Sequence, residues 1–151
     1  MRELLELLLA NLDGAYLKNG WHGPTLRGAI RGLSAKDVSW RPGKGRHNIW
    51  ELTAHAAYWK YVARRRLTGQ RVRFPLKGSN WIPAPAKIDD ASWQQLVRLL
   101  DEEHRQLREV IAALGDADLR DPRKQRLLYG VAAHDLYHTG QIQLVKKLAR
   151  G

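Results

Sequence analysis

The sequence contains no cysteine among its 151 residues. Disulfide bonds and thiolate metal sites are therefore excluded, and any bound metal ion must be held by histidine, aspartate or glutamate. A chain without cysteine also suits a reducing cytoplasm. No stretch approaches the roughly 18 apolar residues that span a bilayer, and the leucine run near the N-terminus is interrupted by Glu6 and lacks a signal-peptide cleavage site. We therefore expect a soluble cytoplasmic protein with no membrane segment.

Acidic residues are missing from one long part of the chain, between Glu51 and Asp89, whereas nine of the fifteen acids lie from Asp89 to Asp121. The acid-free part carries eight basic residues: Lys60, Arg64, Arg65, Arg66, Arg71, Arg73, Lys77 and Lys87. With a formal net charge of +11, such a field can attract nucleic acid, anionic lipid or an anionic small substrate. Alternatively, basic and acidic helices lie beside each other and the excess charge only keeps the protein soluble.

Four segments have apolar residues at the spacing of a helix, which predicts an all-α protein. Their expected ranges are 3–18, 48–68, 89–114 and 126–149. Four amphipathic helices in a chain of this length are most simply buried together. We therefore expect one domain, residues 1–151, folded as a four-helix bundle.

Long irregular connections are expected between the first and second helices and between the second and third. The connection 20–47 should hold a short helix at 25–33 and a capped single turn that begins at Ser34. The connection 70–87 contains three prolines and, we expect, an extended piece at 71–74. Loops of this length are often functional covers.

Two histidines, His134 and His138, lie four residues apart in the last predicted helix. On a helix their rings project from one face, one turn apart, which suits two ligands of a single ion. Both fall on the core-facing stripe, where an imidazole without a partner costs about 1–3 kcal/mol. His55 falls on the inner stripe of the second helix, among small alanines. A single buried histidine is usually a satisfied core residue, but three from two helices favour a metal site.

Asp135 follows His134, so the pair has the form HDxxH, close to the HExxH motif of zinc proteases. We reject that assignment, because those enzymes need a glutamate as general base and usually take a third ligand downstream. Residues 139–151 contain no histidine, aspartate, glutamate or cysteine. The third ligand has to come from upstream, which again indicates His55.

The run 134–142 reads HDLYHTGQI, and together with His55 it resembles the DinB-like (YfiT-like) metalloprotein superfamily. The stretch 32–42 and the segment 48–50 before His55 also resemble the first half of that family. The resemblance implies a four-helix bundle with one histidine from the second helix and an HxxxH pair from the last. It also implies a divalent metal, zinc or nickel with iron as a further candidate, and a homodimer. Some members are thiol transferases that use low-molecular-weight thiols such as bacillithiol or mycothiol, and many have no known activity.

Three neutral nitrogen ligands leave at least one coordination position open, which is typical of catalytic metal sites. Water bound there has a pKa of about 7 on zinc, and a bound thiol loses its proton. Because the chain has no cysteine, a thiol would have to come from a cosubstrate. The basic residues Arg64, Arg65, Arg66 and Arg71 could hold the carboxylates of that cosubstrate, although a solvated helix surface explains them as well.

Several further residues fall near the expected site. Gln141, about one turn beyond His138, could orient a ligand or simply cap a polar pocket. Glu103 could serve as a fourth ligand or a base, but we expect it at the edge of its stripe, facing solvent. Asp135 could be a hydrogen-bond partner of an imidazole, but its position next to His134 turns it partly away.

Aromatic residues and two loop histidines complete the candidates. We expect Trp50 and Trp59 to pack near the site as core. Trp81, in the long connection, could close over a substrate, but packing of its loop on the bundle is the simpler expectation. His22 and His47 lie in predicted loops and carry no spacing signal.

The sequence therefore leaves three functions open. The first is a metal-dependent enzyme, thiol S-transferase-like or hydrolase-like, that acts on a small molecule. The second is a non-catalytic metal-binding or stress-response protein, such as a sensor or storage module. The third is a basic nucleic-acid binder, which is disfavoured because the chain has neither a recognised binding motif nor a ladder of stacking aromatics.

Overall fold

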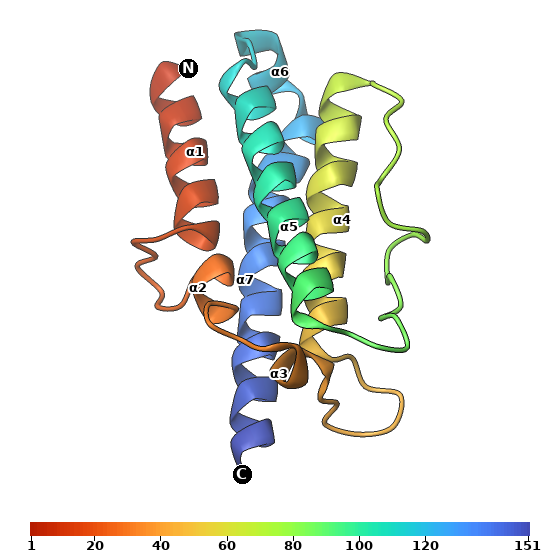
Figure 1. Ribbon diagram of the computed structural model, residues 1–151. Helices are drawn as coiled ribbons and strands as arrows, with labels where there is room; N and C mark the ends of the chain where they lie inside the picture. The colour runs from red at the N-terminus through yellow and green to blue at the C-terminus, as the bar shows by residue number, and fades with distance from the viewer.

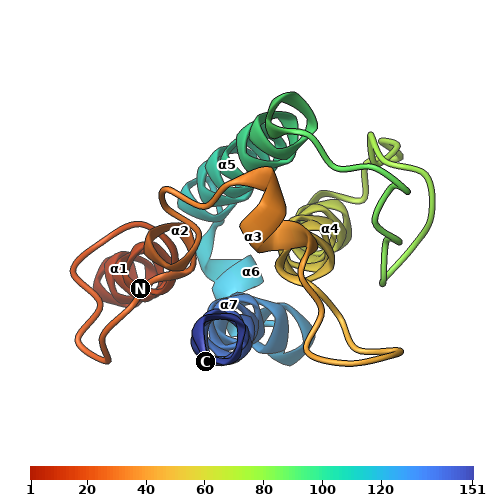
Figure 2. The same ribbon diagram turned by 60° about the horizontal axis from the view of Figure 1, so that its bottom comes forward.

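The computed structural model describes residues 1–151 and is all-helical, as the sequence predicts. The seven helices are α1 (Arg2–Tyr16), α2 (Leu26–Ala29), α3 (Ala35–Ser39), α4 (Ile49–Thr68), α5 (Asp90–Ala112), α6 (Asp116–Arg120) and α7 (Pro122–Arg150). The four long helices α1, α4, α5 and α7 lie side by side (Figure 1). Seen obliquely from below, they form a ring in which α4 and α1 each contact both α5 and α7 (Figure 2). None of the helices has the length and apolar character required to cross a membrane.

The ends of the long helices follow from local capping. The Asn48 side chain accepts a hydrogen bond from the backbone N–H of Glu51 and starts α4, and Gly69, at φ 72°, ends it in the left-handed conformation. Asp89 caps α5 through a reciprocal pair of hydrogen bonds with Ser92. These caps satisfy backbone groups that a helix end leaves without partners. The predicted starts of both helices are confirmed.

Other predicted boundaries are wrong. Helix α7 begins at Pro122 rather than near residue 126, because Asp121 caps it and proline at the first helical position is already in the required φ. The short helix expected at 25–33 is limited to α2. The expected extended piece at 71–74 forms no strand. Helix α6 lies where no helix is predicted, whereas the capped turn at Ser34 is confirmed as the start of α3.

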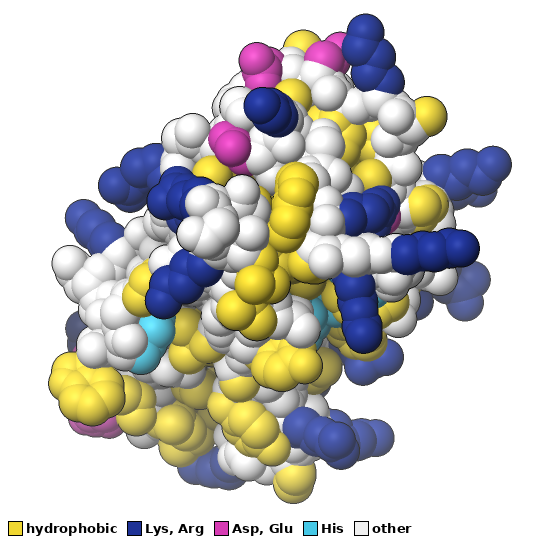
Figure 3. Space-filling view, turned by 90° about the horizontal axis from the view of Figure 1, so that it is seen from below, with side chains coloured by type: hydrophobic (Ala, Val, Ile, Leu, Met, Phe, Trp, Pro, Cys, Tyr) yellow, Lys and Arg dark blue, Asp and Glu magenta, His cyan; other side chains and the backbone are white.

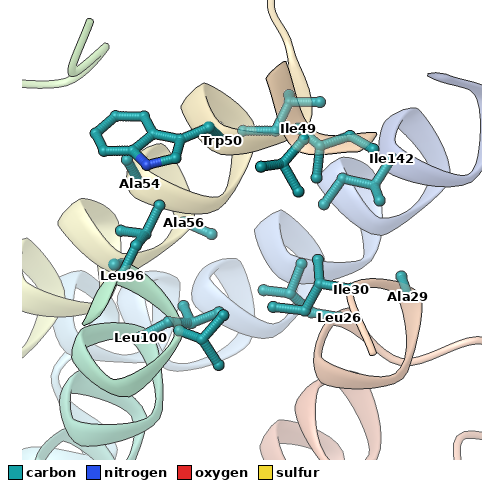
Figure 4. Close-up of a cluster of buried hydrophobic side chains, with 14 of the residues drawn as sticks. Leu26, Ala29, Ile30, Ile49, Trp50, Ala54, Ala56, Leu96, Leu100 and Ile142 are labelled. Carbon is teal, nitrogen blue, oxygen red and sulfur yellow. The ribbon is translucent and has the colours of Figure 1, made fainter. Parts of the chain in front are cut away.

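The apolar core has two clusters. The larger one joins α2, α4, α5 and α7 with Ile82 of the long loop, and part of it is drawn in Figure 4. The smaller one includes Leu12 of α1, Leu107 of α5 and Leu128 of α7. The chain between α4 and α5 runs along the outer side of α4 (Figure 1). Ile82 is 3% exposed, so this loop is anchored to the helices through an apolar contact of its own.

Candidate metal centre

Three histidines from two neighbouring helices converge. His55 projects from α4, and His134 and His138 project from α7, where the four-residue spacing aligns them. The Nε2 atom of His134 lies 3.1 Å from Nε2 of His55 and 3.1 Å from Nε2 of His138. His55 and His138 are buried and His134 is half-buried. One ligand atom from each of the three lies within 4.8 Å of the others, so the group could hold a metal ion.

Two of the imidazoles are oriented by hydrogen bonds at their other nitrogen. His55 Nδ1 donates to the backbone carbonyl of Asn80 at 2.9 Å, and His138 Nδ1 donates to Oε1 of Gln141 at 2.6 Å. A neutral imidazole carries a single N–H, so the Nε2 atoms of His55 and His138 present lone pairs. Such an outer partner fixes the tautomer of a metal-ligating histidine. Gln141 therefore contacts a candidate ligand, which is the orienting role considered for it above.

The donor set fits a divalent transition metal. The Nε2 atoms of His55 and His138 carry lone pairs and cannot donate to His134. His134 Nε2 has at most one hydrogen to donate, so at most one of its two 3.1 Å contacts can be an N–H···N hydrogen bond. Three nitrogens bound to one tetrahedral zinc at 2.0–2.1 Å lie about 3.3 Å apart, close to the 3.1 Å that separates His134 Nε2 from each of the other two Nε2 atoms. A cation among the three Nε2 atoms would satisfy every lone pair. Imidazole suits zinc, nickel and iron alike.

Burial keeps these histidines neutral. Desolvation lowers the pKa of His55 to about 4 and that of His134 to about 3, with the neighbouring histidines lowering both further. Desolvation also lowers the pKa of His138. The neutral form is the one that binds metal, so the site needs no deprotonation near pH 7.

Aromatic rings cover one side of the centre. Trp81 stacks on His55 with ring centroids 3.8 Å apart, and the stacked ring on its other side is His47, at 3.7 Å. Trp59 approaches His134 at 6.0 Å and donates its Nε1–H to Oδ1 of Asn80. The loop of Trp81 therefore packs on the helices, and Trp59 lies at the site. His47, which has no spacing signal in the sequence, is brought into the stack by the fold.

Glu51 anchors the chain that carries these rings. Its carboxylate accepts two hydrogen bonds from Arg41, one from His47 and one from the backbone N–H of Ala84. Although burial opposes ionisation, these donors hold the pKa of Glu51 at about 2. Glu51 therefore holds both His47 and the loop segment that carries Trp81, because Ala84 lies three residues beyond Trp81.

The expectation that Glu103 faces solvent is wrong. Glu103 is buried between α4 and α5, and an oxygen of its carboxylate lies 3.1 Å from a guanidinium nitrogen of Arg64. A single helix stripe predicts which side faces inward, but the edge of that stripe is buried here by the neighbouring helix. Because the Arg64 guanidinium is paired with Glu103, it is not available to bind a ligand.

Asp135 makes no hydrogen bond to the three imidazoles, in line with its expected orientation; it is fully buried and forms an ion pair with Lys60. Lys60 also contacts Nδ1 of His104 at 3.3 Å, and His104 stacks on Tyr16 of α1. Sequence reasoning missed Lys60 as a member of the core. The spacing of Lys60, four residues after Ala56, places it on the inner stripe of its helix. A charged side chain is not expected in the core, so this position was overlooked.

The remaining candidates form no hydrogen bond or ring contact with the three histidines. Trp50 belongs to the large apolar cluster. Arg65 and Arg71 are exposed, and His22 is exposed in the first connection. Lysine and arginine side chains project around the edge of the face seen in Figure 3, where few acidic ones are visible. Because only eight of the 26 lysines and arginines lie in the acid-free part of the chain, the positive charge is not confined to it.

Comparison with known proteins gives one match. No curated protein and no solved structure matches the chain. A family model described as the DinB superfamily matches residues 20–142, which include all three histidines. The chain therefore belongs to the DinB superfamily.

Proposed function

We propose that this protein is a metal-dependent enzyme of the thiol S-transferase or hydrolase type, acting on a small molecule at His55, His134 and His138. The supporting fold is a DinB-type four-helix bundle whose α4 and α7 carry the ligands. The observation that carries the proposal is the convergence of three Nε2 atoms, two of them 3.1 Å from the third. Zinc or nickel is the proposed metal, with iron as a further candidate.

Three nitrogen donors leave room for a substrate on the ion, as catalytic sites require. A divalent ion there would supply Lewis-acid activation of a water or of a thiol. The chain itself supplies orientation: the Asn80 carbonyl fixes His55, and Gln141 fixes His138. Trp81 covers His55 and limits access of water from that side. Since the chain has no cysteine, the thiol of a transfer reaction comes from the cosubstrate.

Metal content tests the site first. The purified, untagged parent is analysed by elemental mass spectrometry beside the double variant His134→Ala/His138→Ala, with the exposed His22→Ala as the matched control. The proposal expects about one equivalent of zinc, nickel or iron in the parent and in the control, and none in the double variant. A parent that takes up no metal, even after incubation with these ions, contradicts it.

Activity separates an enzyme from a non-catalytic metal protein. The metal-loaded parent is assayed for transfer of small thiols to an electrophile such as 1-chloro-2,4-dinitrobenzene, and for hydrolysis of a panel of activated esters and amides. Turnover that disappears in the metal-free double variant supports the enzyme. A fully loaded parent that is inactive in both assays favours the sensor or storage function.

A further inference from the structure

A second feature of the molecule adjoins the candidate centre. A pocket of about 770 Å³ lies between the C-terminal half of α4 and the N-terminal half of α7. Its wall includes the aromatic Trp59, the candidate ligand His134 and four cationic side chains: Arg66, Arg123, Lys124 and Arg126. The volume is that of a small-molecule site, and nothing in the proposed chemistry of the three histidines requires it.

The charge of the pocket is only partly compensated. Asp121 is the acidic residue in the wall, and it contacts Arg123 at 3.4 Å. Lys124 is paired with Asp118 outside the wall. Arg66 and Arg126 have no carboxylate partner in the structure. A concave surface with two free guanidinium groups concentrates a positive field, and a planar guanidinium binds the two oxygens of a carboxylate or phosphate well.

The helical spacing directs this charge toward the candidate centre. Arg126, Gly130 and His134 follow each other at intervals of four residues along α7, so they share one face. On α4, Arg66 lies two turns beyond Trp59, and its guanidinium is 5.9 Å from the centroid of that ring. Gly130 leaves the middle of the wall open, since a Cβ atom added there meets nothing within 4 Å.

We propose that this pocket binds the oxyanion end of the substrate, a carboxylate or a phosphate. Arg66 and Arg126 hold the oxyanion, a flat or apolar part of the molecule lies on Trp59, and the other end reaches His134. The assignment of this ligand as the substrate rests on the proposed function, whereas binding of the anion itself does not. A pocket of this size suits a small molecule and not the backbone of a nucleic acid.

Calorimetric titration with three matched probes tests the pocket: 1-naphthoate, 1-naphthyl phosphate and the uncharged 1-naphthalenemethanol. The parent should bind one or both anions at least about tenfold more tightly than the alcohol, as expected for charge-assisted hydrogen bonds. The better of the two anions identifies the carboxylate or the phosphate. Equal binding of all three probes, or no binding of either anion, overturns the proposal.

Variants locate the binding. Arg66→Gln/Arg126→Gln should weaken anion binding about tenfold or more, and Gly130→Leu should block it by filling the wall. The control Arg65→Gln/Arg71→Gln removes the same charge outside the pocket and should leave the affinity within about twofold. Circular dichroism verifies that each variant is folded. Equal weakening by the two double variants would mean that general attraction, and not this pocket, binds the anion.

The titrations are run on metal-free and metal-loaded parent, so that the two proposals fail separately. A parent that binds metal but shows no preference for the anions refutes the pocket and leaves the metal site intact. A parent that binds the anions through Arg66 and Arg126 but takes up no metal supports the pocket and refutes the metal-dependent enzyme.

Discussion

Breaking the buried ion pair of Lys60 and Asp135 should strongly destabilise the protein. Both side chains are 0% exposed. The other polar contact of Lys60 is Nδ1 of His104, at 3.3 Å, and burial together with the charge of Lys60 holds the pKa of His104 at about 3, so that it is neutral. Asp135→Asn therefore leaves an ammonium group in the core without a counter-charge, which costs about 3–5 kcal/mol. This is a large part of the about 5–15 kcal/mol that stabilises a typical domain.

Urea unfolding of the metal-free protein measures the loss for Asp135→Asn, Lys60→Met and the double variant. Because each single variant leaves one buried charged group without its partner, the double variant should cost less than the sum of the two by more than about 1 kcal/mol. The exposed pair of Arg2 and Glu6 is the control, and Glu6→Gln should cost less than about 0.5 kcal/mol. Additive single costs, or an Asp135→Asn variant as stable as the parent, would refute the reasoning.

Three further predictions concern the metal ligands, pH and capping. Gln141→Leu removes the acceptor of His138 Nδ1–H and should weaken metal binding about tenfold or more, as measured by competition with a chelator. The control Gln143→Leu, two residues further along α7, removes an amide that does not contact His138 and should leave metal binding unchanged. The pKa of His104 is about 3 in the folded protein and about 6.5 in the unfolded chain. The contribution of the neutral ring to the free energy of unfolding is therefore complete above pH 6.5 and is lost as the pH falls toward 3. Between pH 6.5 and 5 this residue should lower the free energy of unfolding by about 2 kcal/mol, and His104→Gln should reduce that difference. Asn48→Ala should cost about 1 kcal/mol in urea unfolding, because it removes the cap of α4, and an unchanged midpoint would contradict the capping argument.

The segregation of basic and acidic residues in the sequence is partly explained by the packing of two helices. Helix α4, which after Glu51 lies in the acid-free part of the chain, packs against α5, which carries several acids. Arg64 and Glu103 meet at that interface and neutralise each other. Arg66, two positions along α4, turns instead toward α7 and enters the wall of the cationic pocket. One run of arginines thus contributes both to the packing of two helices and to a proposed ligand site.

Sequence by itself predicted the four long helices and the candidate ligands, because both follow from local rules. The 3.6-residue period assigns inward and outward faces, and a spacing of four brings His134 and His138 to one face whatever the rest of the chain does. The caps at Asn48 and Asp89 are equally local. His55 lies on a different helix but could still be selected, because like His134 and His138 it is a histidine at an inward-facing position.

Only the tertiary structure decided what surrounds those ligands. Asn80 and Trp81 reach His55 from a loop with no periodicity, so no spacing rule could identify them. Lys60 and Asp135 are charged residues whose burial is tolerable only because each is the counter-charge of the other. That compensation is a property of two helices in contact, and a sequence pattern, which describes one helix at a time, does not contain it.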